Sequence, residues 1–212
     1  LIRGVGAHGA RPHQGRDPVV IAAQVINALQ TIVSREINPV ETGVVTVGSI
    51  HGGTKHNIIP DQVKLQLTVR TYSEKTRRKI LEAIERITVG TARAAGVPED
   101  LLPVISMPEG FLPALYNDPV LTARVAGVFR KTLGPDNVIE IPPTTGGEDF
   151  SEYGRTRHKV PVFMFRLGTA EPGSDPETRP GLHSPLFYPV VEPTIRTGVT
   201  AMTAAVLELM GR

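Results

Sequence analysis

The sequence predicts a mixed α/β protein, in which a ferredoxin-like domain is followed by part of a second α/β structure. Apolar residues recur at helical spacing in two segments of the first half, and apolar runs or period-two alternation mark strands around them. The expected order up to residue 106 is β-α-β-β-α-β, which is the ferredoxin-like order. The pattern changes beyond that point, so we expect domains at residues 1–112 and 113–212.

The first domain is expected to begin with a strand over residues 1–5, which leads into a glycine-rich loop. Asp17-Pro18 predicts a helix start, because Asp suits the N-cap and Pro the first turn. This helix should end before Asn38-Pro39. Residues 42–50 are β-branched and apolar and residues 63–70 alternate between apolar and polar, so both predict strands.

A second helix is predicted to open at Ser73 and to stop near Gly96-Val97-Pro98, and residues 101–106 can supply a further strand. The second half is expected to hold a helix from Asp118-Pro119 to about Gly134-Pro135 and a final helix over 192–210. Between them we expect a short strand at 138–141, a turn at 145–150 that enters a short helix, and a buried strand at 160–167.

Composition excludes several classes of protein. None of the 212 residues is Cys, so neither a disulfide framework nor a thiolate metal site can form within the chain. The formal charge of +2 and the scattered basic residues argue against nucleic acid. We expect no membrane partner and a cytoplasmic location, since no apolar run is long enough to span a bilayer and no signal peptide is visible. The sequence opens within an expected strand and without Met, which indicates a fragment of a longer chain.

Two histidines lie in loops rich in small residues. His8 sits in Gly6-Ala-His-Gly-Ala-Arg-Pro-His13, after a strand and before a helix, where a neutral imidazole could stabilise a developing oxyanion. The alternative is a loop histidine bonded to nearby backbone. His183 lies in Leu182-His-Ser-Pro185, and imidazole is the commonest zinc ligand, but one histidine does not make a site.

Polar residues around the strand expected at 63–70 and in a later turn form further candidates. Asn57 opens the loop-to-strand junction, and Arg70 lies near the far end of that strand, where a guanidinium could grip a carboxylate through two hydrogen bonds. A solvated arginine is the simpler interpretation. Glu148 and Asp149 follow two glycines at a helix start, where carboxylates help as caps against the helix dipole.

Eight segments together carry a resemblance to a known family. They resemble the M20 family of zinc-dependent peptidases and amidohydrolases, and within it the aminoacylase, hippurate hydrolase and auxin-conjugate hydrolase subgroup. They follow the family's order along nearly the whole chain: residues 6–13, 17–20, 34–36, 47–48, 51–54, 57–61, 147–150 and 182–185.

The resemblance implies a two-domain enzyme, in which a ferredoxin-like lid that often dimerises interrupts an α/β zinc-hydrolase catalytic domain. Residues 1–112 would be the lid, with its first strand cut short, and 113–212 the C-terminal part of the catalytic domain. It implies two divalent metal ions, expected to be zinc, held by histidine, aspartate, glutamate and often cysteine ligands, with a glutamate as the general base.

Position by position, the resemblance gives roles to four residues. His183 matches a metal-binding histidine, and His8 matches a lid histidine that reaches an active site, often that of the partner subunit. Asn57 and Arg70 match lid positions that contact substrate, Arg70 through the substrate carboxylate. The glutamate base and the other metal ligands belong to the N-terminal half, so this chain would hold at most one metal ligand.

The expected function is therefore hydrolysis of the amide bond of an N-acyl amino acid or a similar small peptide-like substrate by the complete protein, acting as a homodimer through the lid. The 212 residues alone should be inactive, because one histidine cannot hold zinc in a four-coordinate site. The alternative is a ferredoxin-like dimerisation or binding module without catalysis, for which residues 42–50 would be the natural pairing edge.

Overall fold

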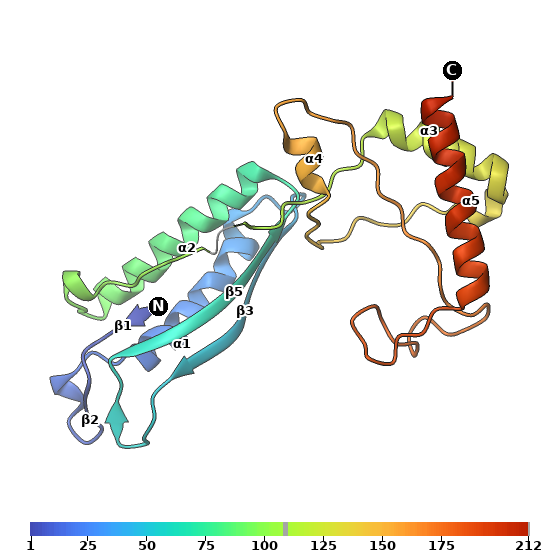
Figure 1. Cartoon of the computed structure of the whole chain (residues 1–212). Helices are drawn as coiled ribbons and strands as arrows, with labels where there is room; N and C mark the ends of the chain where they lie inside the picture. Colours follow the sequence, from blue (N-terminus) through green and yellow to red (C-terminus); the bar gives the residue numbers. More distant parts are fainter. Residues whose placement is uncertain (108–109, 212) are drawn as a thin grey trace. The chain divides into compact units, whose positions relative to one another are not determined.

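The structure, a computed structural model, describes residues 1–107 and 110–211, and the chain separates into two compact units. The first unit comprises Leu1–Leu115 together with Thr144–Asp149, and the second comprises Tyr116–Pro143 and Phe150–Arg212. Figure 1 follows the chain through both. The predicted mixed α/β class is confirmed. The boundary predicted at 112/113 remains a prediction about the domains of the whole protein.

A three-stranded antiparallel sheet forms the first unit, with the strand order β1 (Ile2–Arg3), β5 (Gln62–Thr71) and β3 (Gly43–Gly52). The helices α1 (Pro18–Thr31) and α2 (Glu74–Ala94) lie on the same face of the sheet, as Figure 1 shows. This order with both helices on one face is the arrangement expected for a ferredoxin-like unit.

The core of the first unit lies between the two helices and the sheet. Alternate residues of β5 and one face of each helix supply it, because strand side chains point to opposite faces and helical ones repeat about every 3.6 residues. Its fully buried aliphatic side chains include Ile21, Val25, Leu29, Ile32, Val63 and Ile80.

Both helices of the first unit begin where the sequence predicts. The Asp17 side chain accepts a hydrogen bond from the backbone N–H of Val19 at 2.8 Å, and Ser73 accepts one from Thr76 at 3.4 Å. Each cap satisfies a backbone donor that has no partner inside the helix. After α1 the chain continues through a π-helical turn, η2 (Ile32–Glu36), and leaves helical structure before Asn38-Pro39, as predicted.

The strand predicted at 101–106 does not form. A short 3₁₀ turn, η3 (Glu99–Leu101), is followed by an extended segment in which only Val104 pairs with the sheet. The Val104 N–H donates to the Leu1 carbonyl at 3.0 Å, and the Leu1 amino group donates to the Val104 carbonyl at 2.7 Å. Pro103 has no N–H to offer a ladder and β1 is two residues long, so pairing stops there. The two ends of the segment 1–104 therefore lie side by side.

At the opposite end of the sheet the first unit forms a tip. Here β2 (Ala7–His8) pairs with β4 (Ile58–Ile59), and a 3₁₀ turn, η1 (Pro12–Gln14), precedes α1. The strand predicted at 42–50 is longer in the structure: β3 extends through Gly52, which pairs with Val63.

The second unit is built around two helices, α3 (Pro119–Leu133) and α5 (Val191–Met210). Asp118 caps α3 by accepting a hydrogen bond from the Leu121 N–H at 2.8 Å, as predicted. Phe129 packs edge-on against Phe165 at 4.9 Å between ring centroids, and the buried Ala201 and Ala205 of α5 complete this cluster. A 3₁₀ turn, η4 (Pro135–Asn137), and the predicted short helix, α4 (Ser151–Arg155), lie between the two.

Two predicted strands of the second unit are wrong. Residues 138–141 and 160–167 are extended but form no ladder with the described part of the chain. Around Met164 a side chain takes the place of a neighbouring strand: the Asn117 amide donates to the Met164 carbonyl at 2.8 Å and accepts from its N–H at 2.9 Å. An apolar run becomes a strand only when a neighbour satisfies its backbone groups. No described helix is long and apolar enough to cross a membrane.

Candidate functional site

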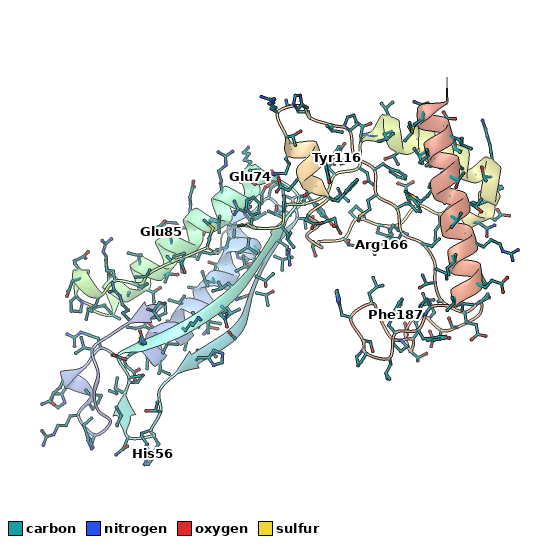
Figure 2. The ribbon with its side chains drawn as sticks, in the orientation of Figure 1. His56, Glu74, Glu85, Tyr116, Arg166 and Phe187 are labelled. Carbon is teal, nitrogen blue, oxygen red and sulfur yellow. The ribbon has the colours of Figure 1, made fainter. Side chains whose placement is uncertain are left out.

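His8 and Asn57 lie together at the tip of the first unit. His8 faces Ile58 in the β2–β4 register, and the N–H of Gly9 donates to the Asn57 carbonyl at 2.7 Å. A side chain at Gly9 would crowd this contact, because its Cβ would lie 3.0 Å from that carbonyl oxygen. Both His8 and Asn57 are exposed. Figure 2 labels His56 at this tip and shows how far it projects from the helices.

The imidazole of His8 is oriented by its own loop. Its Nδ1 accepts a hydrogen bond from the backbone N–H of Ala10 at 3.1 Å. In a neutral imidazole one nitrogen accepts and the other carries the proton, so this contact places the proton on Nε2. The exposed His8 thus has an N–H donor on Nε2, the kind of group that oxyanion stabilisation requires. The sequence indicated the donor role, but it gave no sign of which nitrogen would serve.

Arg70 lies at the other end of the same sheet. It pairs with Val44 near the end of β5, whereas Asn57 precedes the start of this ten-residue strand. Ten residues of antiparallel strand span about 30 Å. Within one chain, the structure therefore brings His8 and Asn57 together and keeps Arg70 away from both.

The half-buried Arg70 side chain forms no hydrogen bond or ion pair with any residue in 1–107 or 110–211. Beside it runs the loop Thr144–Asp149, which belongs to the first unit by its contacts. The Glu148 N–H donates to the Pro113 carbonyl at 3.3 Å, which ties this loop to the segment that follows the first unit's helices. The sequence did not predict that this loop lies beside Arg70, although its two glycines at 146 and 147 indicated a turn.

His183 lies in the second unit, in an exposed turn between residues 168 and 190. The turn is closed by hydrogen bonds from Ser184 N–H to the Gly181 carbonyl at 2.9 Å and from Phe187 N–H to the Ser184 carbonyl at 3.0 Å. An exposed imidazole on a defined turn fits the role of a metal ligand. However, no three His, Asp or Glu side chains of the described residues gather into a group that could hold a metal. A metal at His183 needs further ligands from elsewhere.

Comparison with known proteins gives a consistent result. Residues 2–93, which include the whole helix-covered sheet, match the peptidase dimerisation domain of M20 enzymes. The chain is 36% identical over 206 residues to a probable hydrolase of Synechocystis, covering 97% of this chain and 50% of that protein. It is 39% identical over 152 residues to the N-acetyl-L-cysteine deacetylase of Bacillus subtilis, covering 72% and 35% respectively.

Solved structures agree with the sequence relatives. A crystal structure from methicillin-resistant Staphylococcus aureus, assigned as an aminohydrolase, has a TM-score of 0.74 at 33% identity and covers 97% of this chain. The chain belongs to the M20 family. A dinuclear metal binding M20 peptidase from Bacillus subtilis shares the fold, with a TM-score of 0.61 over 98% of the chain.

The M20 relatives are hydrolases, and this chain spans about half the length of those it matches, at 50% of the Synechocystis protein and 48% of the Staphylococcus one. The dimerisation-domain match ends within α2, one residue before its last. It includes His8, Asn57 and Arg70 and leaves out His183. The dimerisation-domain match therefore covers three of the four candidate residues.

Proposed function

We propose that this chain is part of a metal-dependent amidohydrolase that removes the acyl group from an N-acyl amino acid or a similar small substrate. The observation that carries the proposal is the tip of the first unit, where a donor-presenting His8 lies beside Asn57 within an M20 dimerisation domain. The similarity to an N-acetyl-L-cysteine deacetylase supports the choice of substrate class.

Each candidate residue has a role that suits its chemistry. Bound divalent metal ions, expected to be zinc, would activate water and polarise the scissile carbonyl. His183 would supply one ligand to them. The Nε2–H of His8 would donate to the oxygen that gains negative charge as the amide is attacked. Asn57 would orient the substrate, and Arg70 would bind its carboxylate through two parallel hydrogen bonds.

The distance between the tip, which carries His8 and Asn57, and Arg70 suggests that these residues meet on one substrate only in a dimer. A small substrate cannot reach from the tip to Arg70, since β5 alone spans about 30 Å. A homodimer resolves this if His8 and Asn57 of one protomer act on the substrate held by Arg70 of the other. In the described part of the chain β3 is paired on one side only, so its other edge is available for such a pairing.

A mixing experiment tests the proposal on the full-length enzyme. We expect His8→Ala to lower kcat for N-acyl amino acids by about 10²- to 10³-fold, with little change in KM. Arg70→Ala should raise KM. Mixed and re-equilibrated, the two variants should recover about a quarter of the wild-type kcat/KM, measured at substrate well below the raised KM, because half of the dimers are hybrids and each hybrid has one intact site.

The outcomes separate the alternatives clearly. No recovery on mixing would mean that His8 and Arg70 act within one protomer, and the two-chain site would be wrong. If the metal-loaded wild-type enzyme hydrolyses no N-acyl amino acid, the amidohydrolase proposal fails. A dimer without activity would then favour the non-catalytic module.

A further inference from the structure

Gly147 lies where a side chain would force its neighbours to move. A Cβ built on it would be 2.5 Å from Nη1 of Arg70, 2.8 Å from Cβ of Leu112 and 3.2 Å from the Leu112 carbonyl oxygen. Its φ is outside the left-handed region that favours glycine. The need for glycine at this position is therefore a matter of space and not of backbone conformation.

The segment around Leu112, which faces Gly147 opposite Arg70, is held in place by contacts on both sides of Leu112. The Phe111 ring lies under the Arg77 guanidinium, 3.7 Å from the ring centroid, which fastens this segment to α2. One residue beyond Leu112, the Pro113 carbonyl accepts the Glu148 N–H at 3.3 Å. Because Leu112 is held on both sides, a side chain at position 147 would displace the flexible end of Arg70 most easily, and residue 147 would also have to shift to relieve the 2.8 Å contact with the Leu112 Cβ.

We propose that Gly147 is a positioning residue for Arg70, which by lacking a side chain lets the guanidinium take the place from which it binds the substrate carboxylate. The inference rests on the proposed function, because it concerns the residue assigned to that carboxylate. A methyl group at 147 would displace Nη1 by about 1 Å, and a shift of that size can cost as much as 100-fold when geometry is strict.

The adjacent glycine provides a matched control. A Cβ on Gly146 would meet nothing closer than the Thr144 hydroxyl oxygen at 3.9 Å, which is an ordinary contact. Gly146 also has no left-handed φ. Alanine at 146 therefore makes the same chemical change in the same loop without touching Arg70.

The test uses the full-length metal-loaded enzyme with hippurate as substrate and the uncharged hippuramide as a competing ligand. We expect Gly147→Ala to raise KM for hippurate by about tenfold or more, with kcat and the hippuramide inhibition constant within about twofold of wild type. Gly146→Ala should match wild type in all three. Equal behaviour of the two alanine variants, or equal weakening of both ligands by Gly147→Ala, would overturn the inference.

Repeating the Gly147→Ala change in an Arg70→Lys enzyme distinguishes an effect on the position of Arg70 from a general effect on the structure. Arg70→Lys lacks Nη1, so adding Gly147→Ala to it should give little further increase in KM, whereas the same increase in both backgrounds contradicts the proposal. If the wild-type enzyme is inactive on hippurate and on every other N-acyl amino acid tested, the proposed function fails. The inference is then decided by crystals of Gly147→Ala: a displaced Arg70 guanidinium supports it, and an unmoved one refutes it.

Discussion

Two exposed histidines of this chain accept hydrogen bonds on opposite ring nitrogens. Ala10 donates its N–H to Nδ1 of His8 at 3.1 Å, whereas the Arg157 side chain donates to Nε2 of His158 at 3.0 Å. A neutral imidazole keeps its proton on the nitrogen that does not accept. The two rings should therefore carry their protons on different atoms, on Nε2 in His8 and on Nδ1 in His158.

This difference is directly measurable. Long-range ¹H–¹⁵N NMR spectra of the chain, recorded above the histidine pKa range, should show His8 as the Nε2–H tautomer and His158 as the Nδ1–H tautomer. His158 serves as the internal control. A His8 ring protonated on Nδ1 would remove the donor that we assign to it.

Residue types and their order were enough to identify His8, Asn57, Arg70 and His183 as candidates. What they could not reveal is which candidates meet, because Asn57 and Arg70 are separated by an entire strand. The space shared by Gly147 and Arg70 was hidden for a similar reason. It arises from tertiary packing of segments far apart in sequence.

Elements were predictable where their determinants are local. The helices α1, α2 and α3 begin at Asp17, Ser73 and Asp118 because each of these side chains caps its own backbone. A strand depends on a pairing partner from another part of the chain, and the local sequence does not show which segment that is. Residues 160–167 are apolar enough for a strand, yet Met164 pairs with a side chain. The same reasoning applies to β3, which is an edge strand in the described part of the chain, so any further partner would come from elsewhere.

The unpaired edge of β3 leads to a prediction about dimerisation of the chain. In this chain Ile50 on β3 is 49% exposed, and Ile50→Lys should weaken dimerisation by about tenfold or more, because charge on an edge strand opposes edge-to-edge pairing. Val160→Lys, at a similarly exposed position in the second unit, is the control and should leave the dimer intact. Sedimentation equilibrium measures both. A wild-type monomer would contradict pairing through β3.

An ion pair links the end of α2 to η3. Arg93 binds Glu99 through two hydrogen bonds of 3.0 Å, and the side-chain hydrogen bond from Arg93 holds the pKa of Glu99 below its usual value. A depressed carboxyl pKa means that the pair stabilises the fold above the unfolded pKa and loses this effect as pH falls through the folded pKa. The pair is exposed, so the gain is small.

Removing Arg93 should return the pKa of the Glu99 carboxyl group to its ordinary value. We expect Arg93→Ala to raise the pKa of Glu99 toward its ordinary value, as followed by ¹³C NMR titration of the Glu99 side chain. Arg86→Ala, which removes the separate pair with Glu36, should leave that pKa unchanged. An unaltered pKa in Arg93→Ala would show that the hydrogen bonds do not form in solution.

At the scale of the whole molecule, the chain covers 50% of the Synechocystis relative and its described residues gather no three-ligand metal group. Its two units each have a core of their own, one between the sheet and its two helices and one between α3 and α5. The metal ions of the proposed function should therefore not contribute to the folding of these residues.

A chelator tests this separation. EDTA should abolish hydrolysis by the full-length enzyme and leave the melting temperature of the 212-residue chain unchanged, because one histidine adds little metal affinity. Added zinc should restore the enzyme and have no effect on the melting of the chain. A chain whose melting temperature falls in EDTA would contain a metal site that the structure does not show.

The reciprocal hydrogen bonds between Leu1 and Val104 have a consequence for how such a unit can be exchanged between proteins. A domain whose two ends lie close together can be inserted in place of a surface loop of another protein, because it does not force the two ends of that loop apart. It can therefore be inserted, deleted or exchanged as one unit. Transplanting residues 1–104 into a tight turn of an unrelated monomer should leave the recipient folded and bring two copies of it together.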